Sequence, residues 1–293
     1  MPSPYVRRRR LAAEIRKLRE SRGLTTDGLA RLVFHSRTKI TRLENAQVRP
    51  DLTEIMNMLD ALEITGSEYD RLCKLAREAS QKGWWDRYGM SVGSRQKIAA
   101  DLEYNAAHVR SYDQTAMPGA LQCRPFIEAL IKLDEGQMSR NYQPERMTEA
   151  RERRRQELLR PNGPFYETIL DECVIHRLAV TPEVMADQLR HMIKTVSEHT
   201  SIKIRVLLHN ARVPGGLPPQ SSFYLYTFTE PDDPPIAVVD TVTADLVLTQ
   251  RGELARYDVM YDRLREAALS PEDSIAFLER VAKQLTGAAG SGA

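Results

Sequence analysis

The stretch "HSRTKITRLENAQVRP", residues 35–50, decides how the N-terminal part of this chain folds. Ser36 can cap a helix that begins at the next residue, and a proline ends the stretch. Within that helix, Ile40 and Leu43 are the only large apolar side chains, and their spacing places both on one face, toward a core. The outward face and the first turn then carry Arg37, Thr38, Thr41 and Arg42.

These four outward side chains are suited to reading DNA. When a helix enters the major groove N-terminus first, arginine can donate two hydrogen bonds to guanine, and a threonine methyl can touch thymine. Further round the helix, where phosphates would lie, are Lys39, Asn45 and Arg49. Phosphate contacts position a protein on the duplex without reading its sequence. We therefore predict that the first set contacts bases and the second contacts phosphates. The alternative is a fold of the same kind used only for protein contacts.

The charge of the chain is unevenly distributed. Residues 1–50 hold 13 Lys+Arg and 4 Asp+Glu, a balance of +9, whereas the other 243 residues carry −7. A basic N-terminal part on a mildly acidic remainder indicates that one end binds a polyanion. Four consecutive arginines cannot share one helix face. We therefore expect Arg7, Arg8, Arg9 and Arg10 to form a fraying arm that contacts phosphates.

The length and composition predict a globular protein of about two domains. The chain has 293 residues, of which 42% are hydrophobic and 28% are charged. Its apolar runs are far shorter than the ~20 residues of a membrane span, and no secretory signal follows the N-terminus. Its three cysteines form no CxxC pair, which suits a reducing cytoplasm.

Helical patterns and caps divide residues 1–80 into five short helices, which predicts an all-α N-terminal domain. The segment "LARLVFHSRTKITRLENAQVRPD" resembles the helix-turn-helix of the lambda-repressor-like (Xre-type) DNA-binding family. The resemblance implies base contacts from Arg37, Thr38 and Arg42, and a structural salt bridge between Arg19 and Glu44. It also implies phosphate contacts from Thr25, Thr26, Asn45 and Arg49.

Two positions depart from the pattern of that family. Phe34 stands in the turn where the family usually has glycine, and Ala46 replaces the glycine that usually ends the recognition helix. Both departures predict a left-handed backbone on a residue with a Cβ atom, at a cost of ~1 kcal/mol each.

The rest of the chain mixes helices and strands. Helical patterns cover about 95–112, 122–134, 144–160, 182–199 and 251–285, and strand patterns cover 165–170, 202–208, 222–228, 235–240 and 245–249. Strands that follow several helices predict an α+β domain with a mainly antiparallel sheet. We place a junction at residues 81–95, this domain at 96–286 and a flexible tail at 287–293.

This second part also resembles a known family. "GWWDRYG", "DLEYNAAHVRSYDQTAMPGALQC", "RRRQELL", "ILDECVIHR" and "ALSPEDSIAFLERVA" occur in the order found in a large C-terminal domain of unknown function. That domain follows a helix-turn-helix in many actinobacterial regulators. The resemblance implies a regulator that responds to a signal, either a small-molecule effector or a small acidic protein partner.

Nothing in the sequence predicts an enzyme, a cofactor or a metal site. The six histidines have no HExxH or HxH spacing, and no nucleophile or phosphate-binding motif is present. Asp171 and Glu172 are interpreted as favourable charges at a helix start. If a ligand or partner pocket exists, we expect it among the sheet aromatics, which core packing explains equally well: Phe165, Tyr166, Tyr224 and Tyr226.

The sequence therefore predicts a cytoplasmic, sequence-specific transcriptional regulator that binds double-stranded DNA as a homodimer. Dimers are expected because one recognition helix makes too few base contacts for specificity. One alternative is an antitoxin-like module whose main activity is binding a partner protein, with DNA binding serving autoregulation. Another is an enzyme with a DNA-binding appendage, which the missing catalytic motifs argue against.

Overall fold

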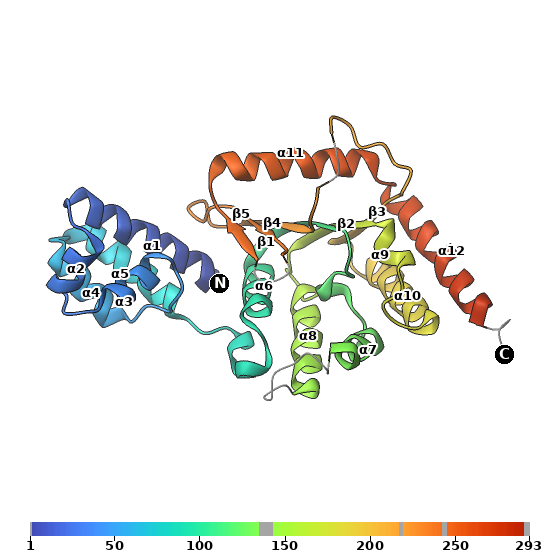
Figure 1. The fold of residues 1–293 in the computed structure, drawn as a ribbon, viewed down its shortest axis with the longest axis horizontal. Coiled ribbons are helices and arrows are strands. Elements are labelled where there is room, and N and C mark those ends of the chain that lie inside the picture. The colour runs from blue at the N-terminus through green and yellow to red at the C-terminus, as the bar shows by residue number, and fades with distance from the viewer. Residues whose placement is uncertain (1, 135–142, 217–218, 242–244, 290–293) are drawn as a thin grey trace. The chain divides into compact units, whose positions relative to one another are not determined.

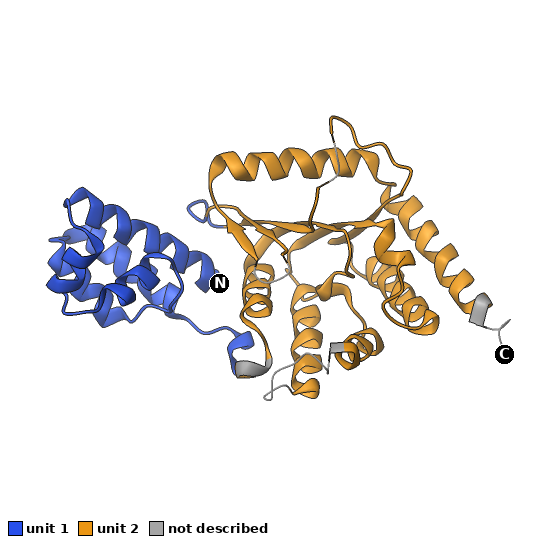
Figure 2. Ribbon diagram, in the orientation of Figure 1, with its two compact units in different colours: residues 1–87, 230–233 blue, residues 88–229, 234–293 orange. Residues whose placement is uncertain are grey.

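The computed structural model describes residues 2–134, 143–216, 219–241 and 245–289 (Figure 1). The chain divides into two compact units (Figure 2): residues 1–87 with 230–233, and residues 88–229 with 234–293. A helical N-terminal unit followed by a unit of helices and strands confirms that part of the sequence prediction. Among the described residues, no helix is long and apolar enough to cross a bilayer.

The first unit is built from α1 (Pro4–Ser21), α2 (Thr26–Leu32), α3 (Arg37–Glu44), α4 (Leu52–Ala61) and α5 (Gly66–Ser80). A polar side chain fixes the start of α1 to α4 by accepting a hydrogen bond from the backbone N–H three residues later. The capping residues are Ser3, Thr25, Ser36 and Asp51. Such caps matter here because α2 and α3 are too short to be stable in isolation.

The core of the first unit joins all five of these helices. Ile15 of α1, Ile40 of α3 and Ile55 of α4 are fully buried in it. Leu43 is buried as well, so the two apolar residues of α3 face inward as the sequence predicts. Each side of α3 therefore has one role: the inner side packs and the outer side meets solvent.

The prediction that Arg7 to Arg10 form a fraying arm is wrong. All four lie within α1, whose start is fixed by the Ser3 cap. Arg7 is buried, with Nε 3.3 Å from Glu78 and Nη2 3.2 Å from Asp233. Arg10 Nη1 lies 2.7 Å from Asp233. Carboxylates that neutralise the charges of Arg7 and Arg10 hold these two side chains in the fold.

The second unit contains a six-stranded sheet of order β3-β2-β1-β4-β5-β6. The strands are β1 (Ala106–Asp113), β2 (Phe165–Asp171), β3 (Ile202–Leu207), β4 (Phe223–Phe228), β5 (Ile236–Val239) and β6 (Leu246–Leu248). β1, β2 and β3 run parallel, and β4, β5 and β6 continue from β1 by antiparallel pairing. The sheet is therefore mixed, and the prediction of a mainly antiparallel sheet is wrong.

That error arises from one strand. The helix expected over residues 95–112 ends at Asn105, because α6 (Ser94–Asn105) is followed directly by β1. β1 lies in the middle of the sheet, where Val109 and Tyr112 are fully buried on opposite faces. Packing on both faces overrides the weak local signal of this segment. Since β1 pairs in parallel on one side and antiparallel on the other, missing it hid the mixed character.

Helices cover both faces of the sheet (Figure 1). α11 (Arg251–Ala267) lies along one face, where Tyr261 and Leu264 pack with Phe223 and Tyr112. The opposite face carries α6, α8 (Pro144–Leu158) and α10 (Pro182–Glu198). The remaining elements are η1 (Trp84–Ser91), η2 (Gly119–Leu121), α7 (Arg124–Asp134), α9 (Glu172–His176) and α12 (Pro271–Ala289).

The predicted flexible tail falls only partly on described residues. Residues 287–289 belong to α12, which packs against α10 and β3. Residues 290–293 lie outside the described residues. The helix expected over 251–285 is divided into α11 and α12, with Pro271 as the first residue of the second helix.

Phe34→Gly should stabilise the first unit. Phe34 has φ 53° and is 95% exposed, so glycine would relieve the left-handed strain without removing packed surface. We expect the free energy of unfolding to rise by about 1 kcal/mol in urea titrations. Phe34→Ala is the matched control: it removes the ring but keeps the Cβ atom, so an equal gain in that variant would contradict the explanation.

Candidate functional site

The exposed face of α3 is the candidate nucleic-acid interface. Its side chains at the first turn and along the outer side are all exposed: Arg37, Thr38, Thr41 and Arg42. Arg37 is 71% exposed and its Nη1 lies 3.6 Å from Asp27, an ion pair too open to compete strongly with a base edge. The structure thus brings together the four residues predicted to contact bases.

A buried ion pair holds α3 against α1. Arg19 Nε lies 2.6 Å from Glu44 Oε1, and Nη2 lies 3.1 Å from Oε2, with the side chains 9% and 5% exposed. Arg19 also donates to the carbonyl of Leu24 at 2.7 Å. The hydrogen bond to Glu44 raises the pKa of Arg19 despite the opposing effect of burial. The pair is the one implied by the family resemblance, and it fixes the C-terminal end of α3.

Left-handed residues stand at both ends of α3. Phe34 has φ 53° and Ala46 has φ 55°, which confirms the backbone predicted at these positions. The residue after each of them donates a backbone hydrogen bond to the carbonyl five residues earlier. His35 N–H donates to the Ala30 carbonyl and Gln47 N–H to the Arg42 carbonyl, both at 2.9 Å. This hydrogen-bond pattern closes a helix C-terminus sharply. The two turns therefore define where α2 ends and where α3 ends.

The residues predicted to contact phosphate have intramolecular roles as well. Thr25 caps α2 by accepting from Gly28 N at 3.0 Å, and Lys39 pairs with Glu54. Arg49 lies 2.9 Å from Asp86, and Asn45 accepts from Arg16 at 2.8 Å. Phosphate contacts by these side chains, by Thr26 and by Arg7 to Arg10 remain predictions.

Breaking the ion pair should destabilise the first unit. Glu44→Ala would leave the Arg19 guanidinium buried without its carboxylate, which costs about 3–5 kcal/mol. The unfolding midpoint of the first unit in urea should fall accordingly. Arg22→Ala is the control, because Arg22 and Glu63 are 41% and 79% exposed and such pairs contribute about 1 kcal/mol or less. Equal losses in both variants would show that the Arg19–Glu44 pair is not the stabilising contact.

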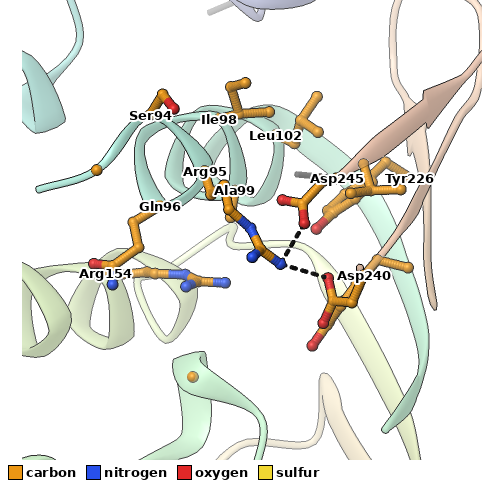
Figure 3. A pocket seen from close by; sticks show the side chains of 14 residues that line it. Ser94, Arg95, Gln96, Ile98, Ala99, Leu102, Arg154, Tyr226, Asp240 and Asp245 are labelled. Carbon is orange, nitrogen blue, oxygen red and sulfur yellow. Dashed lines mark ion pairs between the residues drawn. The ribbon is translucent and has the colours of Figure 1, made fainter. Parts of the chain in front are cut away.

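The second unit contains a pocket of about 420 Å³, lined by charged and apolar side chains, between α6, α8 and the strands β4 and β5 (Figure 3). Arg95 forms ion pairs there with Asp245 and, at 3.9 Å, with Asp240. Across the pocket, Arg154 donates to both carboxylate oxygens of Glu103 at 2.5 Å. Burial opposes the charge of Arg154, but Glu103 outweighs it and raises the pKa of Arg154.

Tyr224 connects this pocket to a buried carboxylate. Its hydroxyl donates to Asp113 Oδ1 at 2.7 Å, while Ser111 and Thr168 donate to Oδ2 at 2.7 and 2.8 Å. Burial raises the pKa of Asp113 to about 6, although the three hydroxyl donors oppose the shift. Burial also raises the pKa of Asp240, and Asp245 adds to the effect.

The predicted aromatic residues do not form one pocket. Tyr224 and Tyr226 line the pocket of Figure 3, whereas Phe165 and Tyr166 line a second hollow of about 440 Å³ with His108 and Lys203. Sequence reasoning missed the charged residues of the first pocket, Arg95, Arg154, Asp240 and Asp245. These four residues come from segments far apart in the sequence, so no spacing motif brings them together.

Asp113→Asn should remove a pH dependence of stability. The folded protein binds a proton at Asp113 near pH 6 and the unfolded chain near pH 3.8, so the folded state holds more protons between these values. Stability attributable to Asp113 therefore falls as the pH rises from 3.8 to 6, by on the order of 3 kcal/mol. The measurement is the free energy of unfolding of wild type and variant from urea titrations at pH 3.8 and at pH 6. The difference between the two proteins should change by this amount between the two pH values. A constant difference would contradict the assignment.

Family models match two segments of the chain. Residues 10–72 match a helix-turn-helix domain, which includes α2 and α3 and supports a DNA-binding regulator. Residues 96–280, more than half of the chain, match a domain of unknown function (DUF5753). The chain belongs to the DUF5753 family, with a helix-turn-helix domain before the family domain. Searches of curated proteins and of solved structures returned no match.

Proposed function

We propose that this protein is a sequence-specific transcriptional regulator of the lambda-repressor-like (Xre) type. The observation that carries the proposal is the arrangement of side chains on α3. Its outer face has four exposed polar side chains. Its inner face is held by the buried Ile40 and Leu43, and its C-terminal end by the ion pair of Glu44. A rigid helix with exposed arginine and threonine at its first turn suits insertion into a major groove. A protein with this role works in the cytoplasm, where the DNA of a bacterial cell lies.

The proposed active form is a homodimer. One α3 reaches only a few base pairs, and two copies on adjacent half-sites would supply the specificity that a single helix lacks. The dimer is part of the proposal, and the second unit is the proposed source of its contacts, since the first unit is small and its outer face is assigned to DNA.

The second unit is the proposed receiver of a signal. The pocket beside Arg95 and Tyr226 has a volume of about 420 Å³, within the range of small-molecule sites. Its ion pairs and phenol groups would favour a polar effector. A small acidic protein is the other partner that the proposal allows, and binding of either one would alter the affinity for DNA.

Arg37→Ala and Arg42→Ala should each weaken binding to the cognate site by about 1–3 kcal/mol and relax specificity at one base pair. The measurement is a titration with DNA fragments from the region upstream of the protein's own gene. Arg71→Ala is the control, because Arg71 is a half-exposed arginine on α5. Unchanged, salt-independent binding by both α3 variants would refute the role of this helix.

A further inference from the structure

The carboxyl ends of β2 and β3 bring three metal-ligand side chains together. The strands are parallel, with Asp171 aligned to Leu207. Cys173 follows two residues after the end of β2, and His209 follows two residues after the end of β3. One ligand atom from each of Asp171, Cys173 and His209 lies within 4.8 Å of the others. We propose that these three residues bind a divalent transition-metal ion of the zinc class.

The donor types select the metal. A thiolate and an imidazole favour zinc and neighbouring transition metals, whereas magnesium and calcium take oxygen ligands almost exclusively. Cys173 Sγ and His209 Nδ1 are 3.9 Å apart. Sulfur and nitrogen ligands of a tetrahedral zinc ion are about 3.6 Å apart. A small rotation of the exposed His209 side chain brings the two donors to that separation.

Neighbouring groups already orient the ligands. Asp171 Oδ2 accepts from the hydroxyl of Tyr112 at 2.8 Å, and Oδ1 accepts from the backbone of Cys173 at 2.9 Å. Each carboxylate oxygen keeps a lone pair for a cation. Glu172 Oε2 accepts from the backbone N–H of His209 at 2.7 Å, which ties the residues after β3 to those after β2. Such outer contacts fix ligand direction in metal sites.

The three ligands line a cavity of about 850 Å³ that also includes Leu207, Val213 and Gly215. Three protein ligands leave one position of a tetrahedral ion open. The open position would take water or a small anionic or thiol group. On binding, the Cys173 thiol loses its proton to solvent and the thiolate coordinates the ion.

The experiment is a cobalt(II) titration of the full chain, reduced and metal-free, followed by optical absorption. We expect one equivalent to produce a thiolate-to-cobalt charge-transfer band, which Cys173→Ser removes. Cys73→Ser and Cys123→Ser should keep the band, since these cysteines are buried elsewhere. Zinc should displace the cobalt, and magnesium should not.

Two further variants separate binding from folding. His209 is exposed, so His209→Ala should fold normally and weaken cobalt binding at least tenfold, as should Tyr112→Phe through loss of its hydrogen bond to Asp171. Absence of the band in the wild-type chain would overturn the proposal, as would its persistence in Cys173→Ser or unchanged affinity in His209→Ala. DNA binding does not enter this test, so its outcome is independent of the proposed regulatory function.

Discussion

The buried pair between Arg19 and Glu44 is the interaction on which the position of α3 depends. Glu44 is the last residue of α3, where the helix dipole disfavours a negative charge. Arg19 offsets that cost by contacting both carboxylate oxygens, and Arg16 adds a hydrogen bond to the Glu44 carbonyl at 2.8 Å. Because α3 has only eight residues, these contacts together with Ile40 and Leu43 set its direction. The outer side chains then need no role in folding.

In the second unit the corresponding constraint is the central strand β1. It pairs in parallel with β2 and antiparallel with β4, so it joins the two halves of the sheet. Its last residue, Asp113, is buried among three hydroxyl donors, one of which belongs to the pocket-lining Tyr224. The parallel half places the ends of β2 and β3 side by side, which assembles the proposed metal ligands. The antiparallel half carries Tyr226 and Asp240 to the pocket beside Arg95.

The first unit was largely predictable because its determinants are local. Ser36 as a cap and Ile40 and Leu43 as inner residues follow from spacing within a few residues, and the left-handed backbone at Phe34 follows from the glycine that the resembling family usually has there. The arginine run was misjudged because its partners, Glu78 and Asp233, are far away in the sequence. The same reason explains the second unit: β1 depends on neighbours on both sides. Likewise, Cys173 and His209 meet only through the register of β2 and β3, so no spacing motif reveals them.

The outer face of α3 is proposed to read bases in the major groove. Methylation interference tests it most directly, because methylating guanine N7 blocks an acceptor that lies in the major groove. We predict that methylation at specific guanines within the bound sequence prevents binding by the wild-type protein. We also predict that Arg37→Ala or Arg42→Ala makes binding insensitive to methylation at one of them. Binding that is unaffected by N7 methylation at every guanine, with contacts confined to phosphates or the minor groove, would contradict the claim.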